Sequence, residues 1–290
     1  MFKFDVSVCI CTRNRPENLK LALDSLPKSS YPVFEIIVSD DSTNNDTEIL
    51  MQSAYPHIKY LPGPRRGLGA NRNNALKAVT GSHVLFIDDD AVLAENFLET
   101  VVQASHNIIK NEDDIDRIIF TGSQLEHGVL MCARNTDFLG FQKIPYMEGE
   151  LMKTIVINSA VFPKDIFQEV LFDEKLVYGC DEVDFTTRAV KEGYKIVLCP
   201  EAINLHLPSI INRDFYKPYH EASRIYVTFK HYFSTDKNRL KALLFLAVAS
   251  AHTTLHTFKV EGVRGILKVT STFRIVYSYL ALEYFSEQKS

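Results

Sequence analysis

Three consecutive carboxylates, Asp88, Asp89 and Asp90, directly follow the short apolar run 84–87. An apolar run of this length is typical of a strand buried on both faces, and adjacent aspartates are poor strand formers. Two unit charges about 4 Å apart repel by roughly 1 to 4 kcal/mol in wet surroundings. A hard divalent cation such as Mg²⁺ or Mn²⁺, which typically shares the phosphates of a substrate, would remove this repulsion. The alternative is a solvated turn, because Asp is also a common turn residue.

Two earlier apolar runs also end in polar residues. The run VSVCIC (6–11) leads into Thr12-Arg13-Asn14-Arg15, and FEIIV (34–38) leads into Ser39-Asp40-Asp41-Ser42. In an open parallel sheet, the loops after the carboxyl ends of the strands lie along one edge, where ligands bind. We therefore expect both loops to meet the three aspartates at that edge, around a divalent cation and a phosphorylated ligand.

The elements that must position these loops alternate between strand and helix over the first 122 residues. The expected strands cover residues 6–11, 34–38, 58–61, 83–87 and 117–122. One expected helix begins at Pro16, and three more cover residues 46–53, 69–79 and 95–109. Strands that alternate with helices predict an α/β domain with a mostly parallel central sheet flanked by helices.

The pattern changes after residue 122. Residues 123–154 predict loops or short antiparallel strands. After them we expect strands at 154–162 and 195–199, helices at 164–170 and 181–192, and two or three helices from about residue 215 onward. We therefore divide the chain into a catalytic domain, 1–208, with halves 1–122 and 123–208, and a helical C-terminal extension, 209–290.

The net charge of −4 conceals an asymmetry along the chain. From residue 211 onward there are twelve Lys and Arg against six Asp and Glu, so this part carries +6 and residues 1–210 carry −10. The basic residues are spread among aliphatic ones, which favours an anionic membrane surface as partner and argues against nucleic acid.

Residues 242–258 hold no Lys, Arg, Asp or Glu. Packing of this segment on the body as a helix, a position in the membrane interface, and a membrane span are the alternatives. The length approaches that of a span, but the Ser, Thr and His side chains within the segment disfavour one.

The N-terminus and the cysteines bear on the cellular location. The N-terminus lacks the pattern of a signal peptide, and the five Cys are odd in number and irregularly spaced, which favours reduced thiols. Cys9 and Cys11 lack a second pair of ligands, which disfavours a zinc site. We expect a cytoplasmic protein, peripheral on the cytoplasmic face of the membrane.

Four segments, in order, resemble the family 2 glycosyltransferases, which have the GT-A fold. They are VSVCICTRNRPENLKLALDSL, EIIVSDDST, GLGANRNNALKAVTGSHVLFIDDDAVL and VYGCDEVDFTTRAVKEGYKIVLCPEAINLH. The resemblance covers about residues 4–208. It implies a GT-A domain in which residues 1–122 bind the nucleotide sugar and residues 123–208 carry the acceptor and catalytic groups.

The resemblance also implies roles for single residues. Asp40 would hydrogen-bond the nucleobase, and Arg72 would lie near the nucleotide unless it only occupies a solvated helix face. His206 stands where many members have a metal ligand, although a lone His is often structural. The implied nucleotide-sugar set is Thr12, Asn14, Arg15, Asp40, Asp41, Arg72, Asp88 and Asp89. The implied metal set is Asp88 and Asp90, the outer members of an Asp-x-Asp motif, with His206.

Glu182 stands where the family has its catalytic base, but the usual Glu-Asp order is reversed, so Asp181 remains a rival for that role. The resemblance implies an inverting hexosyl- or deoxyhexosyltransferase that uses a nucleoside-diphosphate sugar and Mn²⁺ or Mg²⁺. The segment HEASRIYVTFKHY (220–232) resembles part of bacterial sugar transferases that build surface polysaccharides, which indicates a glycan or lipid-linked acceptor. A sugar nucleotidyltransferase, or a catalytically inactive transferase-like scaffold or binding protein, is the alternative.

Overall fold

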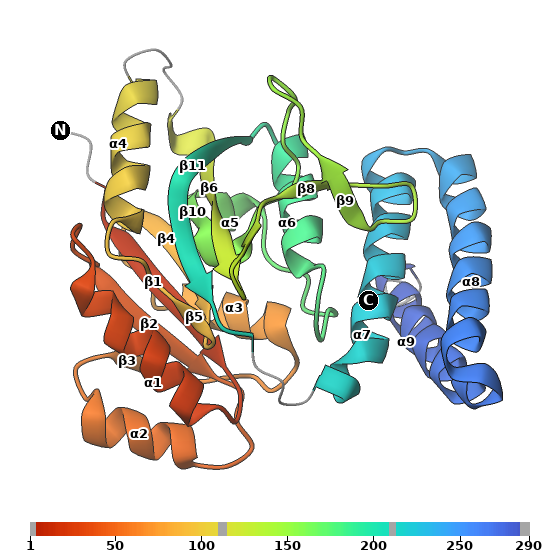
Figure 1. The fold of residues 1–290 in the computed structure, drawn as a ribbon, viewed down its shortest axis with the longest axis horizontal. Coiled ribbons are helices and arrows are strands. Elements are labelled where there is room, and N and C mark those ends of the chain that lie inside the picture. The colour runs from red at the N-terminus through yellow and green to blue at the C-terminus, as the bar shows by residue number, and fades with distance from the viewer. Residues whose placement is uncertain (1–3, 110–114, 209–212, 285–290) are drawn as a thin grey trace.

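The fold is a central sheet with helices on both faces and a group of long helices beside it (Figure 1). It is known from a computed structural model, which describes residues 4–109, 115–208 and 213–284 of the 290-residue chain. The expected α/β class, with a mostly parallel sheet and a helical C-terminal region, is confirmed.

The sheet is built around parallel strands that follow the apolar runs of the sequence. The strands are β1 (Val6–Thr12), β2 (Glu35–Asp40), β3 (Lys59–Pro62), β4 (His83–Asp88), β5 (Ala91–Val92), β6 (Ile118–Glu126), β7 (Val129–Met131), β8 (Arg134–Thr136), β9 (Gln142–Pro145), β10 (Ala160–Pro163) and β11 (Lys195–His206). Their order in the main sheet is β3-β2-β1-β4-β10-β6-β11-β5, with β7 paired to β6, while β8 and β9 pair separately.

Parallel pairing joins the strands that end in polar loops. β1 pairs in parallel with both β2 and β4, and β6 pairs in parallel with β11, whereas β10 runs antiparallel between β4 and β6. All seven residues of β1 are buried, as expected for a central strand covered on both faces. The carboxyl ends of β1, β2 and β4 therefore lie at one edge.

Two layers of helices cover the sheet. The helices are α1 (Pro16–Ser25), α2 (Asp46–Ala54), α3 (Leu68–Leu76), α4 (Phe97–Ile109), α5 (Ile166–Glu169), α6 (Asp181–Lys191), α7 (Arg213–Lys230), α8 (Arg239–Glu261) and α9 (Ile266–Tyr284). α1, α2 and α4 share one hydrophobic core with the sheet, and α3, α5 and α6 share a second. In α1, Pro16 occupies the first turn, and Leu19, Ala22 and Leu23 form the buried face.

A third core lies among the C-terminal helices and includes residues of the preceding half. Leu176 and Val183, from the loop before α6 and from α6 itself, pack with buried residues of α7, α8 and α9 such as Tyr226 and Phe245. The helical region is therefore packed on the sheet-bearing body through α6.

The strand expected at 154–162 is wrong in its first part. β10 begins only at Ala160, and residues 157–159 form a turn of 3₁₀ helix. Side-chain hydrogen bonds take the place of backbone pairing between strands there. Asn158 Oδ1 accepts the backbone N–H of Asp88 at 2.8 Å, and Ser159 Oγ donates to the Ser123 carbonyl at 2.7 Å. The turn thus supports the backbone at the start of the aspartate run.

The strand expected at 195–199 is too short at its carboxyl end. β11 continues to His206, with a shift of register against β6 between Leu198 and Ile203. Pro200 falls within this irregularity, where the missing N–H of proline is tolerated. The longer strand brings His206 beside β5, where it pairs with Ala91.

Candidate active site

One cavity of about 390 Å³ opens at the carboxyl ends of β1, β2 and β4. The loops that line it are far apart in the sequence and meet as the shared edge of a parallel sheet requires. The predicted site residues on its wall are Thr12, Arg15, Asp41, Asp88, Asp89, Asp90 and His206. The other five, Asn14, Asp40, Arg72, Asp181 and Glu182, are not among the described residues that line it.

Asp40 and Asp41, at the end of β2, face different surroundings. Asp40 is 5% exposed, and its carboxylate accepts the Tyr60 hydroxyl at 2.9 Å and the backbone N–H of Ser42 at 2.8 Å. Asp41 lines the cavity, and its Oδ1 accepts the backbone N–H of Arg65 at 2.8 Å. Burial raises the pKa of Asp41. Asp41 is thus the carboxylate of this pair that a ligand in the cavity can contact. Asp40 instead stabilises the loop through its hydrogen bonds to Ser42 and Tyr60.

Asn14 ties the loop after β1 to the loop after β2. Its φ of 55° lies in the left-handed region, which Asn adopts more readily than most residues. Its backbone N–H donates to Ser42 Oγ at 2.7 Å, and its Oδ1 accepts the backbone N–H of Thr43 at 2.9 Å. Asn14 therefore fixes the shape of both loops.

Asp89, the middle carboxylate, is held by the loop after β1. Thr12 Oγ1 donates to Asp89 Oδ2 at 2.8 Å, and Arg15 Nη1 lies 3.0 Å from Asp89 Oδ1 and 3.4 Å from Asp90 Oδ2. Burial raises the pKa of Asp89 to about 7, although Arg15 acts to lower it. The side chain of Asp89 is 4% exposed and that of Asp88 is 32% exposed, so Asp88 is the more accessible of these two carboxylates.

Asp90 and His206 form a carboxylate–imidazole pair on the cavity wall. Asp90 Oδ1 lies 3.3 Å from His206 Nε2, and His206 Nδ1 lies 3.1 Å from Glu126 Oε2. Burial alone would lower the pKa of His206, but the hydrogen bond and charge of Asp90 raise it overall. Within the described ranges, no group of three or more His, Cys, Asp or Glu side chains is arranged to hold a metal ion.

Arg72, on α3, bridges the aspartate run and α6. Its side chain is 2% exposed, forms ion pairs with Asp88 at 3.1 Å and with Asp181, and lies over the rings of Phe86 and Phe172 at 5.9 and 5.4 Å. The interpretation of Arg72 as part of a solvated helix face is therefore wrong. Its guanidinium couples the sheet edge to the acidic pair that begins α6.

Asp181 and Glu182 occupy the first turn of α6 in unlike environments. Asp181 is buried against Arg72, whereas Glu182 is only partly buried, and its Oε1 accepts Gln142 Nε2 of β9 at 3.1 Å. Burial, with the adjacent charge of Asp181, raises the pKa of Glu182 to about 7. A carboxylate with such a pKa can take a proton near neutral pH. The helix begins after Gly179 and Cys180, both in the left-handed region with φ of 83° and 58°.

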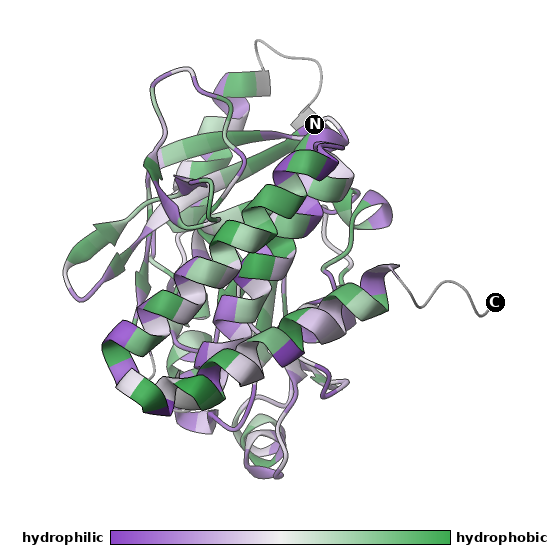
Figure 2. Cartoon of the chain, turned by 90° about the vertical axis from the view of Figure 1, so that its right-hand side faces the viewer, coloured by the Kyte–Doolittle hydropathy of each residue, from purple (hydrophilic) through white to green (hydrophobic). Residues whose placement is uncertain are grey.

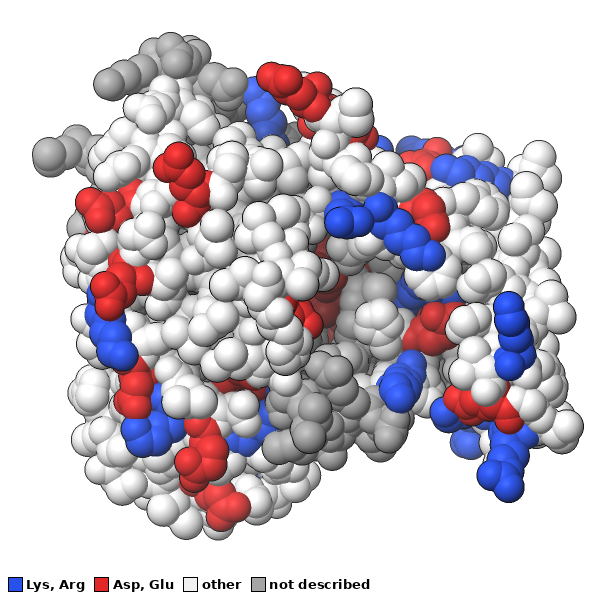
Figure 3. All heavy atoms as spheres, in the orientation of Figure 1, with Lys and Arg blue, Asp and Glu red and all other residues white. Residues whose placement is uncertain are grey.

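The C-terminal region contributes directly to the cavity, which the sequence pattern did not predict. Tyr216, Lys217 and His220 of α7 lie on its wall. Tyr216 stacks on Tyr178 with ring centroids 4.5 Å apart and accepts Arg13 Nη1 at 3.4 Å on its hydroxyl. The only available signal was the mixture of aromatic and basic residues in YKPYH (216–220). Figure 3 shows a hollow between the body and these helices, with acidic side chains inside it.

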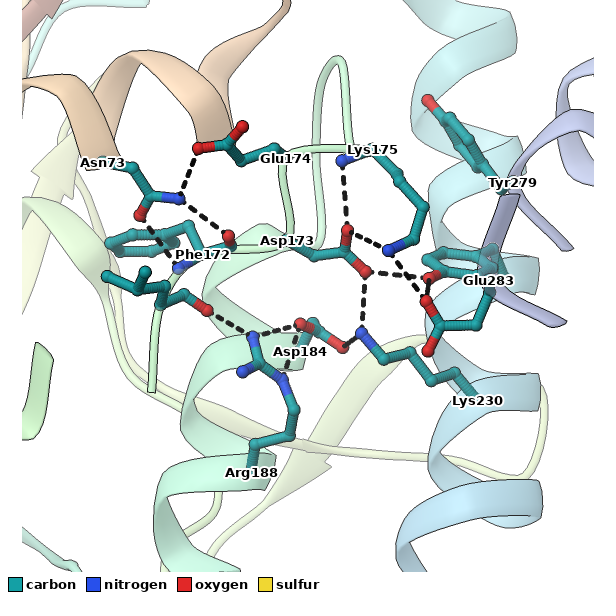
Figure 4. Close-up of polar contacts among 12 residues, drawn as sticks. Asn73, Phe172, Asp173, Glu174, Lys175, Asp184, Arg188, Lys230, Tyr279 and Glu283 are labelled. Atoms are coloured by element: carbon teal, nitrogen blue, oxygen red, sulfur yellow. Dashed lines mark hydrogen bonds and ion pairs between the residues drawn. The ribbon is translucent and has the colours of Figure 1, made fainter. Parts of the chain in front are cut away.

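An ion-pair network fixes α6 against the C-terminal helices (Figure 4). Lys230 of α7 lies 2.7 Å from Asp173 and 2.9 Å from Asp184, and Arg188 lies 2.6 Å from the same Asp184. Further members of the network, Lys175, Tyr226 and Glu283, connect Asp173 to α7 and α9. Asp184 and Arg188 thus do more than form a pair within one helix.

Known proteins resemble this chain in sequence and in fold. The sequence pattern described as "Glycosyl transferase family 2" matches residues 7–113. GalNAc(5)-diNAcBac-PP-undecaprenol beta-1,3-glucosyltransferase of Campylobacter jejuni is 29% identical over 188 residues, which are 60% of this chain and 56% of that protein. UDP-Glc:alpha-D-GlcNAc-diphosphoundecaprenol beta-1,3-glucosyltransferase WfgD of Escherichia coli is 28% identical over 96 residues, 32% of this chain and 38% of that protein.

A solved structure extends the likeness over nearly the whole chain. The crystal structure of S. aureus TarS 1–349 in complex with UDP-GlcNAc matches 96% of this chain and 81% of its own, with a TM-score of 0.57 and 17% identity. This likeness supports the expected GT-A fold. The chain spans little more than half the length of its C. jejuni relative. The match of residues 7–113 to the family pattern and the similarity to named glycosyltransferases support the expected assignment to the family 2 glycosyltransferases.

Proposed function

We propose that the chain is a cation-dependent, inverting glycosyltransferase that moves a hexosyl or deoxyhexosyl group from a nucleoside-diphosphate sugar to a hydroxyl of a glycan or lipid-linked acceptor. One observation carries the proposal. The ends of β1, β2, β4 and β11 bring four aspartates and an imidazole to one cavity, and Arg72 couples that edge to the acidic pair of α6. The product would serve surface polysaccharide or glycoconjugate synthesis.

The cavity suits a nucleoside diphosphate. Its volume of about 390 Å³ falls within the usual range for small-ligand sites. Asp41 can accept a ring N–H of the nucleobase, and Thr12 lies beside it on the same wall. Arg13 and Lys217 bring positive charge for the diphosphate, a role for which Arg is well suited. The UDP-GlcNAc complex of TarS supports this class of donor.

Asp90 and His206 are the residues that would hold a divalent cation, with Asp88 at the same wall. A carboxylate and an imidazole only 3.3 Å apart can share one ion, and Mg²⁺ or Mn²⁺ usually fills its other positions with waters and phosphate oxygens. When bound, such an ion supplies neutralisation of the charge that develops on the leaving diphosphate.

Glu182 is the proposed general base. With a pKa of about 7 it is partly ionised at neutral pH, and it is less buried than Asp181. Its carboxylate would take the proton of the acceptor hydroxyl as that oxygen bonds to the anomeric carbon. The nucleoside diphosphate leaves from the opposite face with the electron pair of the broken bond, so the configuration inverts. Asp181 has the different task of neutralising Arg72.

The proposed acceptor and location follow from the relatives and the thiols. The C. jejuni and E. coli relatives are both named for saccharides linked to undecaprenol by a diphosphate, which favours an acceptor of this class here. The five cysteines carry free thiols in the structure, and we propose a reducing compartment for the enzyme. We therefore assign the reaction to the cytoplasm, with the enzyme peripheral on the cytoplasmic face of a membrane.

The test is a screen of nucleotide sugars for thermal stabilisation with Mn²⁺ present, followed by product analysis with the best donor. Donor binding raises the melting temperature by mass action. We expect one donor to stabilise the protein and to release nucleoside diphosphate when acceptor is added. Release of pyrophosphate would instead identify a sugar nucleotidyltransferase, and the absence of binding by every donor would favour a transferase-like scaffold.

A further inference from the structure

The outer face of α8 is an apolar stripe without a cover among the described residues. Leu240, Leu244 and Leu255 are 80%, 57% and 70% exposed, and Leu243 and Phe258 are exposed beside them. The opposite face of the helix is buried against α7 and α9. The helix is therefore apolar on both sides, whereas a helix at a water-facing surface normally carries polar residues on its outer side.

The apolar surface continues around the end of α8. Val260 precedes the turn η5 (Gly262–Gly265), and Val263 in that turn is 82% exposed. Leu267, in the first turn of α9, is 76% exposed. Figure 2 shows green segments along α8 and in this turn, separated by paler and purple ones. A contiguous apolar surface of this kind usually marks an interaction site.

Basic residues accompany this surface along the chain, and two of them form ion pairs, Lys241 with Asp236 and Lys268 with Glu261. Between residues 239 and 274 the chain carries six Lys and Arg and a single acid, Glu261. The basic residues are Arg239, Lys241, Lys259, Arg264, Lys268 and Arg274. Figure 3 shows Lys and Arg side chains spaced along the right-hand edge of the molecule, over α8. Apolar residues flanked by Lys and Arg are the composition of helices that lie in the plane of an anionic membrane interface.

We propose that this face, α8 with η5 and the first turn of α9, docks on an anionic phospholipid bilayer. The proposal rests on the proposed function and deepens it, because it identifies the surface by which the enzyme would reach a lipid-linked acceptor. Throughout the described parts of the chain, no helix is long and apolar enough to cross a membrane. Peripheral docking is therefore the mode that this surface supports.

A second copy of the chain suits the surface less well than lipid does. A twofold dimer through this face would bring the same patch together from both copies, and with it two sets of Lys and Arg. Like charges at an interface are unfavourable, whereas an anionic lipid surface attracts each of them. Charge complementarity therefore favours an anionic bilayer over a second copy as the partner of this face.

The test is co-sedimentation of the full chain with vesicles of phosphatidylglycerol and phosphatidylcholine, and with vesicles of phosphatidylcholine alone. We expect binding to the anionic vesicles that weakens as salt is raised. The variants Leu244→Glu and Leu255→Glu should each weaken it about tenfold or more, because burial of a leucine contributes at least that factor. The matched control Ile49→Glu, at a 60% exposed position on α2, should bind like the unmodified chain.

The basic residues have their own variants. Lys259→Ala should weaken binding to anionic vesicles about fivefold at low salt, the effect of removing one basic residue near such a surface. Lys28→Ala, an exposed lysine near α1, should leave it unchanged. Equal binding by the Glu variants and the unmodified chain, or no binding to anionic vesicles at all, would overturn the proposal. A dimer in light scattering that Leu244→Glu dissociates, without vesicle binding, would assign the face to a second copy.

Stabilisation by a nucleotide sugar with Mn²⁺ is measured in parallel on the same variants. The α8 positions lie outside the described lining of the candidate active site, so donor stabilisation should be unchanged in each of them. Loss of vesicle binding with retained donor stabilisation confirms docking as a separate property. Donor stabilisation without any vesicle binding in the unmodified chain overturns the docking proposal alone. Vesicle binding without any donor effect overturns the proposed function alone.

Discussion

The two acids that begin α6 differ in what surrounds them. Asp181 is 2% exposed and forms an ion pair with Arg72, which also holds Asp88 at 3.1 Å. Arg72 and Asp181 are both buried and in contact, and such a pair is stable only while each group keeps its partner, because an unpaired buried charge is costly. Asp181 is therefore needed as the counterion of Arg72. Glu182, with a single amide donor from Gln142, is the acid that remains available for proton transfer.

We expect Glu182→Gln to lower turnover by about 10²- to 10⁴-fold, the usual contribution of a general base, while donor binding is retained. In the unmodified enzyme the raised pKa of Glu182, about 7, means that the base is protonated and inactive at low pH. The rate should therefore rise with pH and reach half its maximum near pH 7. The measurements are the pH dependence of nucleoside diphosphate release and the thermal shift with donor.

Asp181→Asn is the control for this assignment. The charge of Asp181 is, after burial, the main reason why the pKa of Glu182 is raised. Its removal should move the rising limb of the pH profile to lower pH and, in the enzyme that remains folded, leave much of the turnover. The free energy of unfolding should fall, because Arg72 then keeps only Asp88 as its counterion. If Asp181→Asn were inactive and Glu182→Gln were active, Asp181 would be the general base and Glu182 would not.

Residue types and spacing predicted which loops meet at the sheet edge, but they did not predict where each side chain points. The sequence could not show which of Asp40 and Asp41 faces the cavity. The difference depends on the Tyr60 hydroxyl of β3, which donates a hydrogen bond to Asp40. The burial of Arg72 was also hidden, since it depends on Phe172 and Asp181, about a hundred residues further along the chain. Contacts of this range leave no local pattern.

At the scale of elements, the ion-pair network of Figure 4 determines how α6 sits. Lys230 is 11% exposed and lies between Asp173 and Asp184, which are 3% and 4% exposed. Burial alone would raise the pKa of Asp173, but Lys230 holds it well below its usual range. The network thus joins α6, which carries the proposed base, to α7, which lines the cavity.

We expect Lys230→Met to reduce the free energy of unfolding by about 3 to 5 kcal/mol at pH 7, because it leaves two buried carboxylates without their shared partner. Since the folded-state pKa of Asp173 lies well below its unfolded value, the contribution is fully present above that unfolded pKa, about 3.9, and is lost as the pH falls from there through the folded-state pKa. The measurement is urea unfolding at pH 7 and at about pH 2, because most of the loss lies below pH 3.5.

Lys175→Met is the matched control, since Lys175 also contacts Asp173 but is 28% exposed. Water can replace part of its contact, so its loss should cost about 1 kcal/mol or less. Equal costs for Lys230→Met and Lys175→Met, or a cost for Lys230→Met that does not shrink at low pH, would contradict this view of the network.

Elements with strong periodicity were predicted from the sequence, and elements set by their neighbours were not. The alternation over β1 to α4 follows from apolar spacing and helix starts such as Pro16. β10 is shorter than its apolar run because Asn158 and Ser159 bond to other strands. β11 passes Pro200 because β6 continues beside it, and no local signal in residues 200–206 indicates that support.

At the scale of the molecule, the body and the C-terminal helices pack on each other beside the candidate site. α7 supplies Tyr216, Lys217 and His220 to the cavity, and its buried face shares a core with Val183 of α6. The same helical group presents the proposed docking face of α8 on its other side. The boundary predicted near residue 208 therefore separates two sequence patterns that pack on each other.

We expect Phe245→Ala, in the core that α8 shares with α6 and α7, to reduce the free energy of unfolding by about 3 to 5 kcal/mol. If the chain is one cooperative unit, near-UV and far-UV circular dichroism should report a single urea transition, and its midpoint should fall for both signals. Leu244→Ala, its 57% exposed neighbour on the same helix, should change the free energy by no more than about 0.5 kcal/mol. Two separate transitions, with the donor-stabilised one unmoved by Phe245→Ala, would instead mean that residues 1–208 fold and bind the nucleotide sugar without the helices that line its cavity.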